Sequence, residues 1–182
     1  YGTTFRDSNL QNSSFYNAFL WGTEFDDVDL SNSDFRKTIT RTADFRYSIL
    51  RNVSWQDSSI YGNINFGGAD LSYVNFTNTT ISLSSGANLR IVNLSYAVMV
   101  NAVLRNQDLG YSNFTNANLS SAILTGANLT GADFTGANLS GAELTDVDLT
   151  DAEMTDTDLT NVIWQNTICP DGTNSDSNGG FC

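Results

Sequence analysis

The sequence predicts an all-β fold, a solenoid whose square turns each take about twenty residues. A large apolar residue, usually Leu or Phe, stands at almost every fifth position from Phe5 to Trp164. This period fits neither a helix, at about 3.6 residues, nor a flat strand, at about two, so it indicates a repeat architecture. The thirty-two repeats fall into registers of twelve, four and sixteen, and all three are multiples of four, as turns of four repeats require.

The aromatic residues support square turns independently. One side of the square takes Phe5, Phe25, Phe45 and Phe66, and the opposite side takes Phe15, Phe35, Trp55 and Phe76. We expect each set to stack ring over ring in the interior at the strand spacing of about 4.8 Å. Eight such turns would make a rod roughly 38 Å long.

Within each repeat, the large residue at position i and a small residue at position i−2 are expected to fill a narrow core. Positions i−1, i+1 and i+2 are expected to face water, and most are Asn, Asp, Ser, Thr or Gly, which suit tight turns. The segment Ala127-Asn128-Leu129-Thr130-Gly131 follows this pattern without change. Over residues 3–166 the chain resembles the pentapeptide repeat family, and the resemblance implies a right-handed quadrilateral parallel β-helix of about eight turns.

Few repeats depart from this pattern. Thr40 replaces the large residue, and Ile64 and Gln107 replace the small one. Two steps are also too long, and they shift the register within residues 61–65 and 82–88. Both shifts follow a repeat on the fourth side of the square, so we expect bulges at one corner and no change of fold.

The repeat ends after Trp164, and we assign residues 1–166 to the β-helix and residues 167–182 to a C-terminal cap or tail. This segment contains the turn signal Pro170-Asp171-Gly172 and the only two cysteines, Cys169 and Cys182. A disulfide between them would close a loop, which would stabilise the fold by about 3 kcal/mol. It would also hold the segment over the last turn. The alternative is two free thiols in a frayed tail.

The cysteine segment also bears on the compartment. Within the family, a terminal Cys-Pro-Asp-Gly segment resembles that of exported or thylakoid-lumen members. The resemblance and a lasting disulfide imply an oxidising compartment (the periplasm, the exterior or the thylakoid lumen) in preference to the cytoplasm. The chain opens directly in a repeat, and solenoid ends are rarely bare, but the sequence does not tell whether a leader or N-terminal cap was removed.

The composition excludes several classes of function. Histidine is absent, and no phosphate loop, zinc spacing or serine-nucleophile motif occurs, so we predict no enzyme and no cofactor or metal site. The net charge is −12, and eleven acidic residues but no Lys or Arg follow Arg105, so direct nucleic-acid binding is not expected. No apolar run is long enough to span a membrane.

The outward positions give one candidate protein-contact surface. Five of the seven apolar residues at position i−1 fall on the fourth side, namely Phe19, Ile39, Val103, Ile123 and Ile163. Trp21, Arg41 and Tyr61 follow position i on the same side in successive turns, which would place Arg41 between two rings. An apolar strip with a polar rim is typical of a contact surface. The alternative is that these residues pack beneath the bulges or beneath a missing cap.

The acidic half gives a competing surface. Its outward carboxylates belong to Glu143, Asp146, Asp148, Asp151, Glu153, Asp156 and Asp158. On a rod about as thick as a duplex they could imitate DNA and bind a topoisomerase or another DNA-binding enzyme, as the resemblance to gyrase-protecting family members implies. They could also hold Ca²⁺ loosely, or only keep the protein soluble.

The sequence therefore favours a non-enzymatic rigid scaffold or protein-interaction module, monomeric, with an unknown protein partner. The DNA-mimic function is the alternative. An ice- or surface-binding array is disfavoured, because the Thr residues of the last turns are spread over all four sides of the square.

Overall fold

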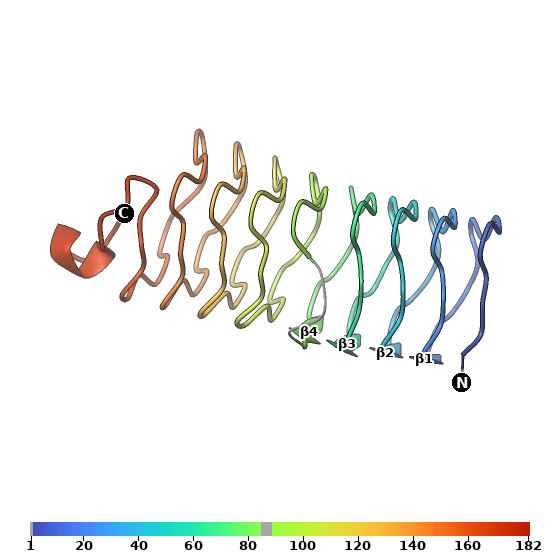
Figure 1. Cartoon of the computed structure of the whole chain (residues 1–182). Helices are drawn as coiled ribbons and strands as arrows, with labels where there is room; N and C mark the ends of the chain where they lie inside the picture. The colour runs from blue at the N-terminus through green and yellow to red at the C-terminus, as the bar shows by residue number, and fades with distance from the viewer. Residues whose placement is uncertain (1, 85–88) are drawn as a thin grey trace.

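The computed structural model describes residues 2–84 and 89–182 and shows one right-handed coil (Figure 1). Its turns follow one another along a rod, with the N-terminus at one end and the C-terminal segment at the other. The predicted quadrilateral parallel β-helix is confirmed. No helix within the described ranges is long and apolar enough to cross a membrane.

Parallel backbone pairing on all four sides of the square holds the turns together. We number the sides 1 to 4 from the repeats centred on Phe5, Leu10, Phe15 and Leu20. On each side, residues at position i−1 pair with their equivalents in the next turn, and the side 2 ladder, for example, runs from Asn9 to Glu153. A side chain is therefore fixed in place by the turns before and after it.

Side 4 carries the only strands longer than a single bridge among the described residues. They are β1 (Phe19–Trp21), β2 (Ile39–Arg41), β3 (Ser59–Gly62) and β4 (Thr80–Leu83), and they form one parallel sheet in that order. The described part of the chain has one helix, a 3₁₀ turn η1 (Ser175–Asn178) in the C-terminal segment. Figure 1 shows the four strands in a row along one edge of the rod.

Position i+2 makes the corners, and its backbone is left-handed in nearly every described repeat. Asn, Asp and Gly fill most corners because they tolerate a positive φ better than other residues. Position i−1 supports the turn that follows: the Asn128 side chain accepts the N–H of Thr130 at 3.0 Å, and the Asp148 side chain accepts that of Thr150 at 2.9 Å. The abundance of Asn and Asp thus has a structural cause at two positions of the repeat.

The core of the first four turns is aromatic, as predicted. Phe5, Phe25, Phe45 and Phe66 stack on side 1 with ring centroids 5.0–5.2 Å apart. Phe15, Phe35, Trp55 and Phe76 follow one another on side 3 with centroids 4.5–5.4 Å apart, with Trp55 tilted by 45° against Phe35. The two columns meet edge to face, so the first half of the rod has a continuous aromatic interior. Beyond Phe76 the described core is mostly Leu and Ala.

The first register shift is absorbed at the corner after β3. Gly62 has a φ of 83°, and its carbonyl accepts the N–H of Ile64 at 3.1 Å. This turn points Ile64 inward, where it is fully buried. The Gly62 carbonyl also accepts the N–H of Ser84 at 2.9 Å, so the second shift begins beside the first, as predicted. Residues 85–88 of that shift lie outside the described residues.

Gln107, which stands where a small residue is usual, bonds to the second shift. Its Oε1 accepts the N–H of Leu83 at 3.3 Å, and its Nε2 donates to the Arg105 carbonyl at 2.7 Å. The longer side chain therefore fixes the edge of the bulge. Equivalent positions still pair across both shifts, since Asp44 pairs with Asn65 and Asp70 pairs with Asn93.

The coil continues one repeat beyond Trp164. Ile168 pairs with Asp148 in the side 1 ladder, and Cys169 takes the central position, where it is only 3% exposed. Cys169 forms the expected disulfide with Cys182. The regular pairing thus extends past the boundary at residue 166, and the division of the chain into two parts stays a prediction.

The C-terminal segment takes the place of a further turn over part of the rod end. Ile168 pairs with Asn174 in the antiparallel sense. Ser175 donates its N–H to the Thr167 carbonyl at 2.9 Å, and its hydroxyl accepts the Thr167 N–H at 3.1 Å. Inside the rod, the Ser33 hydroxyl accepts the N–H of Ser13 in the same way. The cover is partial, because Met154, Leu159 and Trp164 stay half-buried.

Candidate protein-contact surfaces

Side 4 carries the predicted apolar residues in one continuous ladder. Its members are Phe19, Ile39, Ser59, Thr80, Val103, Ile123, Glu143 and Ile163. Phe19 is 78% exposed and Ile163 is 54% exposed, whereas Ile39, Val103 and Ile123 are half-buried. Ser59 and Thr80 interrupt the apolar stripe, so the structure brings Phe19 beside Ile39 but keeps both apart from Val103.

Trp21, Arg41 and Tyr61 lie side by side on β1, β2 and β3. The guanidinium carbon of Arg41 lies 4.9 Å from the centroid of the Trp21 ring and 5.7 Å from that of Tyr61. Each such contact is worth about 0.5–1 kcal/mol at an exposed site. Arg41 is thus held between the two rings, and its charge stays at the surface beside the exposed Phe19.

A hollow of 570 Å³ adjoins this group at the N-terminal end of the rod. It is lined by Thr3, Phe5, Phe15, Phe19, Leu20, Trp21 and Thr23. Phe19 and Trp21 therefore belong both to side 4 and to the wall of an apolar hollow.

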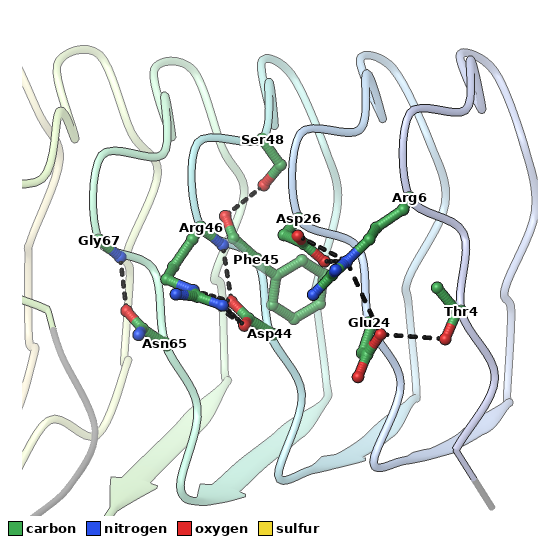
Figure 2. Close-up of polar contacts among 10 residues, drawn as sticks. All are labelled: Thr4, Arg6, Glu24, Asp26, Asp44, Phe45, Arg46, Ser48, Asn65 and Gly67. Atoms are coloured by element: carbon green, nitrogen blue, oxygen red, sulfur yellow. Dashed lines mark hydrogen bonds and ion pairs between the residues drawn. The ribbon is translucent and has the colours of Figure 1, made fainter.

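Side 1 of the first three turns carries a row of ion pairs (Figure 2). Arg6 pairs with Asp26 at 2.8 Å, and Arg46 pairs with Asp44 at 2.6 Å. Burial alone would raise the pKa of Asp44, but the hydrogen bonds and the charge of Arg46 hold it below its ordinary value. A polar hollow of 430 Å³ opens beside Asp44 and Arg46. Since both cations already have carboxylate partners, this face is less suited to an anionic ligand than an unpaired basic patch would be.

The acidic residues at position i−1 are bonded by the turns that follow them. Asp158 accepts the N–H of Thr160 at 2.9 Å, and Glu153 accepts the N–H of Thr155 at 2.9 Å. These threonine bonds lower the pKa of both carboxyl groups. Glu143 instead accepts the Thr125 hydroxyl at 2.6 Å and lies 3.6 Å from Arg105.

The remaining acids of the predicted acidic surface lie at corners. Asp146, Asp151 and Asp156 have φ angles of 56–58°. Asp146 accepts a bond of 2.8 Å from the Asn166 side chain. Asn takes the same corner elsewhere, as at Asn116, so these positions demand a turn-forming residue and not a charge. Across residues 2–84 and 89–182, no three acidic or Cys side chains gather closely enough to hold a metal ion.

Aromatic and aliphatic residues at the corners make a third surface, which was not predicted from the sequence. They are Tyr47, Tyr73, Ile91, Tyr96 and Tyr111, and all five are between 48% and 70% exposed. They stand at position i+2, whereas the predicted apolar strip consists of residues at positions i−1 and i+1. A signal was available, because an apolar residue at a left-handed corner departs from the Asn, Asp and Gly found at most others.

Comparisons with known proteins agree with the coil. The sequence profile described as pentapeptide repeats matches eight copies, over residues 4–39, 87–126, 112–151 and 127–166, which is more than half of the chain. No curated protein matches the chain. The chain is similar to the solved structure of full-length QnrB1, described as a plasmid-mediated fluoroquinolone resistance protein. The two are 22% identical over 88% of this chain and 84% of that one, with a TM-score of 0.56.

Two further solved structures are similar over most of their length. One is HetL from the cyanobacterium Nostoc, a pentapeptide repeat protein involved in heterocyst differentiation regulation, with 24% identity, 94% and 91% of the two chains covered, and a TM-score of 0.34. The other is a pentapeptide repeat protein from the thylakoid lumen of Arabidopsis thaliana, with 30% identity, 74% and 70% covered, and a TM-score of 0.23. The profile match and the repeats that form the coil show that the chain belongs to the pentapeptide repeat family.

Proposed function

We propose that this protein is a rigid, non-enzymatic interaction module that binds a protein partner through the N-terminal turns of side 4. One observation carries the proposal: the exposed Phe19 stands beside the Trp21–Arg41–Tyr61 column on paired strands. Trp, Tyr and Arg are the residues that contribute most to binding energy at protein interfaces.

The rod supports such a contact by holding these side chains in place before binding. Trp21, Arg41 and Tyr61 sit on three paired strands, so their spacing is fixed by the backbone ladder. A preorganised surface binds more tightly because little conformational entropy is lost on association. The proposed contact is therefore a docking surface that does not need to rearrange.

The proposal includes an oxidising compartment. The bond between Cys169 and Cys182 supports it, since lasting disulfides are rare in reducing compartments. The similar Arabidopsis protein comes from the thylakoid lumen. Mass spectrometry of protein from its native source, with and without reductant, tests this point. A gain of about two daltons on reduction supports it, and two free thiols before reduction would contradict it.

The DNA-mimic alternative has less support from the residues. The absence of Lys and Arg after Arg105 leaves the last turns acidic, which favours it. Most of those carboxylates, however, occupy turn positions that Asn fills in other turns. Exchanging the corner acids Asp146, Asp151 and Asp156 for Asn keeps the turns and removes three charges. Loss from this variant of a DNA-binding enzyme that Phe19→Asp still captures would favour the DNA-mimic function over the side 4 contact.

Affinity capture from an extract of the native source tests the side 4 contact, with wild-type protein and two charge variants compared. Phe19→Asp places a charge in the proposed contact, and Val98→Asp places one at the same repeat position on side 3, where Val98 is also exposed. We expect one protein to be captured by wild type and by Val98→Asp and to be lost with Phe19→Asp. Retention of all captured proteins by Phe19→Asp would overturn the proposal.

A further inference from the structure

The corners around side 2 differ from those around the rest of the rod. Among the described residues, five with a positive φ are aromatic or aliphatic, namely Tyr47, Tyr73, Ile91, Tyr96 and Tyr111. Ile91 and Tyr111 stand with Tyr47 at the corner between sides 1 and 2, and Tyr73 and Tyr96 stand at the corner between sides 2 and 3. A left-handed backbone is unfavourable for such bulky side chains, so their confinement to the two edges of one side calls for an explanation.

The corner tyrosines line both edges of side 2, and one pair of their rings is stacked. The rings of Tyr73 and Tyr96 are parallel within 5°, with centroids 4.8 Å apart. On the other corner, the Tyr111 ring covers Gly131, where an added Cβ would lie 2.6 Å from Tyr111 Cε1, and Tyr47 covers Gly68 in the same way. The stacked rings of Tyr73 and Tyr96 cover one another's faces and form one ridge. On the other edge, Tyr47, Ile91 and Tyr111 form an interrupted ridge, with Gly68 between Tyr47 and Ile91 and with the guanidinium carbon of Arg90 5.3 Å from the centroid of the Tyr111 ring. Side 2 is the strip between these two ridges.

The floor between the ridges is small and polar. In the middle turns it is made by Asp70, Asn93 and Ser95, which are half-buried, and by Ser72, which is buried. The backbone there is already paired, since Leu71 donates its N–H to the Asn93 carbonyl at 3.0 Å and Leu94 donates to that of Asn113 at 2.8 Å. A partner on this strip thus cannot join the sheet as another strand, and side chains must recognise it.

The charge on side 2 changes along the rod. Around the ridges the cations are paired, Arg51 with Asp70 and Arg90 with Asp108. In the next two turns the same side and its corners carry Asp133, Asp151, Glu153 and Asp156, and no Lys or Arg follows Arg105. The strip therefore leads from a charge-balanced aromatic part to an anionic part, which complements a partner that is uncharged at one end and basic at the other.

We propose that side 2 binds an extended, proline-rich segment of another protein with Lys or Arg residues at one end. Prolines lie in grooves lined by aromatic side chains when they form a polyproline II helix, and the free carbonyls of that helix can accept bonds from tyrosine hydroxyls. Its repeat of three residues spans about 9.3 Å. This nearly equals two turns of the rod at about 4.8 Å each.

The length of the strip sets the length of the segment. From the turn of Tyr47 to the turn of Glu153 there are five steps of about 4.8 Å, or about 24 Å. A polyproline II helix covers that distance with about eight residues. Since sides 2 and 4 are opposite faces of the square, this site is independent of the proposed side 4 contact, and the rod could hold two partners at once.

Fluorescence anisotropy with labelled synthetic peptides tests the proposal on the whole protein. The probes are six prolines followed by three arginines, the same peptide with the arginines first, and a control in which Gly and Ser replace the prolines. We expect at least one proline peptide to bind, and the control to bind at least tenfold more weakly. Exchanging Tyr73 and Tyr96 for Asn, the residue of corners such as Asn52, should weaken proline-peptide binding at least tenfold.

Two further variants separate the parts of the strip. Tyr16→Asn removes an exposed tyrosine on side 3 and should leave peptide binding unchanged. Exchanging Asp151 and Asp156 for Asn should weaken binding and reduce its salt dependence. Thermal melts verify that each variant is folded.

Three results would overturn the proposal. The first is no binding by either proline peptide. The second is equal binding of the Gly/Ser control, which would mean that the charge of the arginines alone accounts for binding. The third is a dimer of the protein that the Tyr73 and Tyr96 exchange abolishes, because a second copy would then occupy the strip. None of these results bears on capture through Phe19, so failure here is distinguishable from failure of the side 4 contact.

Discussion

At the scale of single residues, each position of the repeat has a separate physical role. Positions i and i−2 fill the core, position i−1 accepts a backbone N–H, and position i+2 takes the left-handed corner. Because these roles recur in most of the described repeats, a residue that departs from its usual type is informative. Trp55, with its buried indole, is one such residue, and the corner tyrosines are others.

Trp55 is fully buried, and its indole N–H is the one side-chain polar atom among the described residues that is buried without a hydrogen-bond partner. Trp55→Phe removes the unpaired donor, which stabilises the fold by about 1–3 kcal/mol. The smaller side chain leaves a cavity, which destabilises the fold by a similar amount. Since Phe35 and Phe76 occupy the same column, we expect a net change below about 1 kcal/mol. Trp55→Ala should cost about 3–5 kcal/mol. Chemical denaturation measures both, and an equal loss in the two variants would contradict the account.

Asp133 provides a prediction about pH. Hydrogen bonds from the hydroxyl and the N–H of Thr135 hold the pKa of Asp133 below its ordinary value. A carboxyl group with a lowered folded pKa stabilises the fold above its unfolded pKa of about 3.9, and this contribution is lost as the pH falls through the folded pKa.

Asp133→Asn keeps the acceptor but does not titrate, as Asn138 does in the next repeat. We expect Asp133→Asn to have a melting temperature close to that of wild type at pH 7. Between pH 5 and pH 2.5, its melting temperature should fall less than that of wild type. Differential scanning fluorimetry across that range measures the difference. Parallel losses in the two proteins would show that the Thr135 bonds do not lower the pKa of Asp133.

At the scale of elements, the C-terminal cap protects only its neighbours. A solenoid is held by contacts between adjacent turns, so a change at one end is not felt at the other. Cys182→Ser opens a disulfide that spans 13 residues and should remove up to about 3 kcal/mol of local stability. Cys182 suits this test better than Cys169, because Cys169 is part of the core.

Hydrogen exchange followed by mass spectrometry checks this prediction. We expect faster exchange over residues 144–175 in Cys182→Ser, and unchanged exchange in the turns of β1 to β4. Uniformly faster exchange along the whole rod would mean that the turns unfold as one unit, which would contradict the nearest-neighbour description.

The sequence predicted the elements of this fold unevenly, for physical reasons. The aromatic columns were predictable because Phe25 and Phe45 are separated in the sequence by the length of one turn, so that one ring lies over the other. The repeat centred on Cys169 was not recognised, because a half cystine replaces the large apolar residue there. The tyrosine ridges were missed because letters alone do not show that Tyr73 adopts a positive φ or that Tyr111 covers a glycine in the next turn.

At the scale of the whole molecule, charge is distributed unevenly along the rod. Up to Arg105 there are eight cations and nine acids, and eleven acids alone follow. Two copies that met through their acidic halves would repel one another. We therefore expect sedimentation velocity in physiological salt to show one species with the mass of a single chain. A stable dimer under those conditions would contradict this expectation.

The central claim, that side 4 meets a protein partner, is tested most directly by site-specific photo-crosslinking in the native source. A photoreactive phenylalanine at position 19 probes side 4, and one at position 98 probes side 3 at the same position of the repeat. We predict one discrete protein adduct from position 19 and none from position 98. The same adducts from both positions, or none from position 19, would contradict the account.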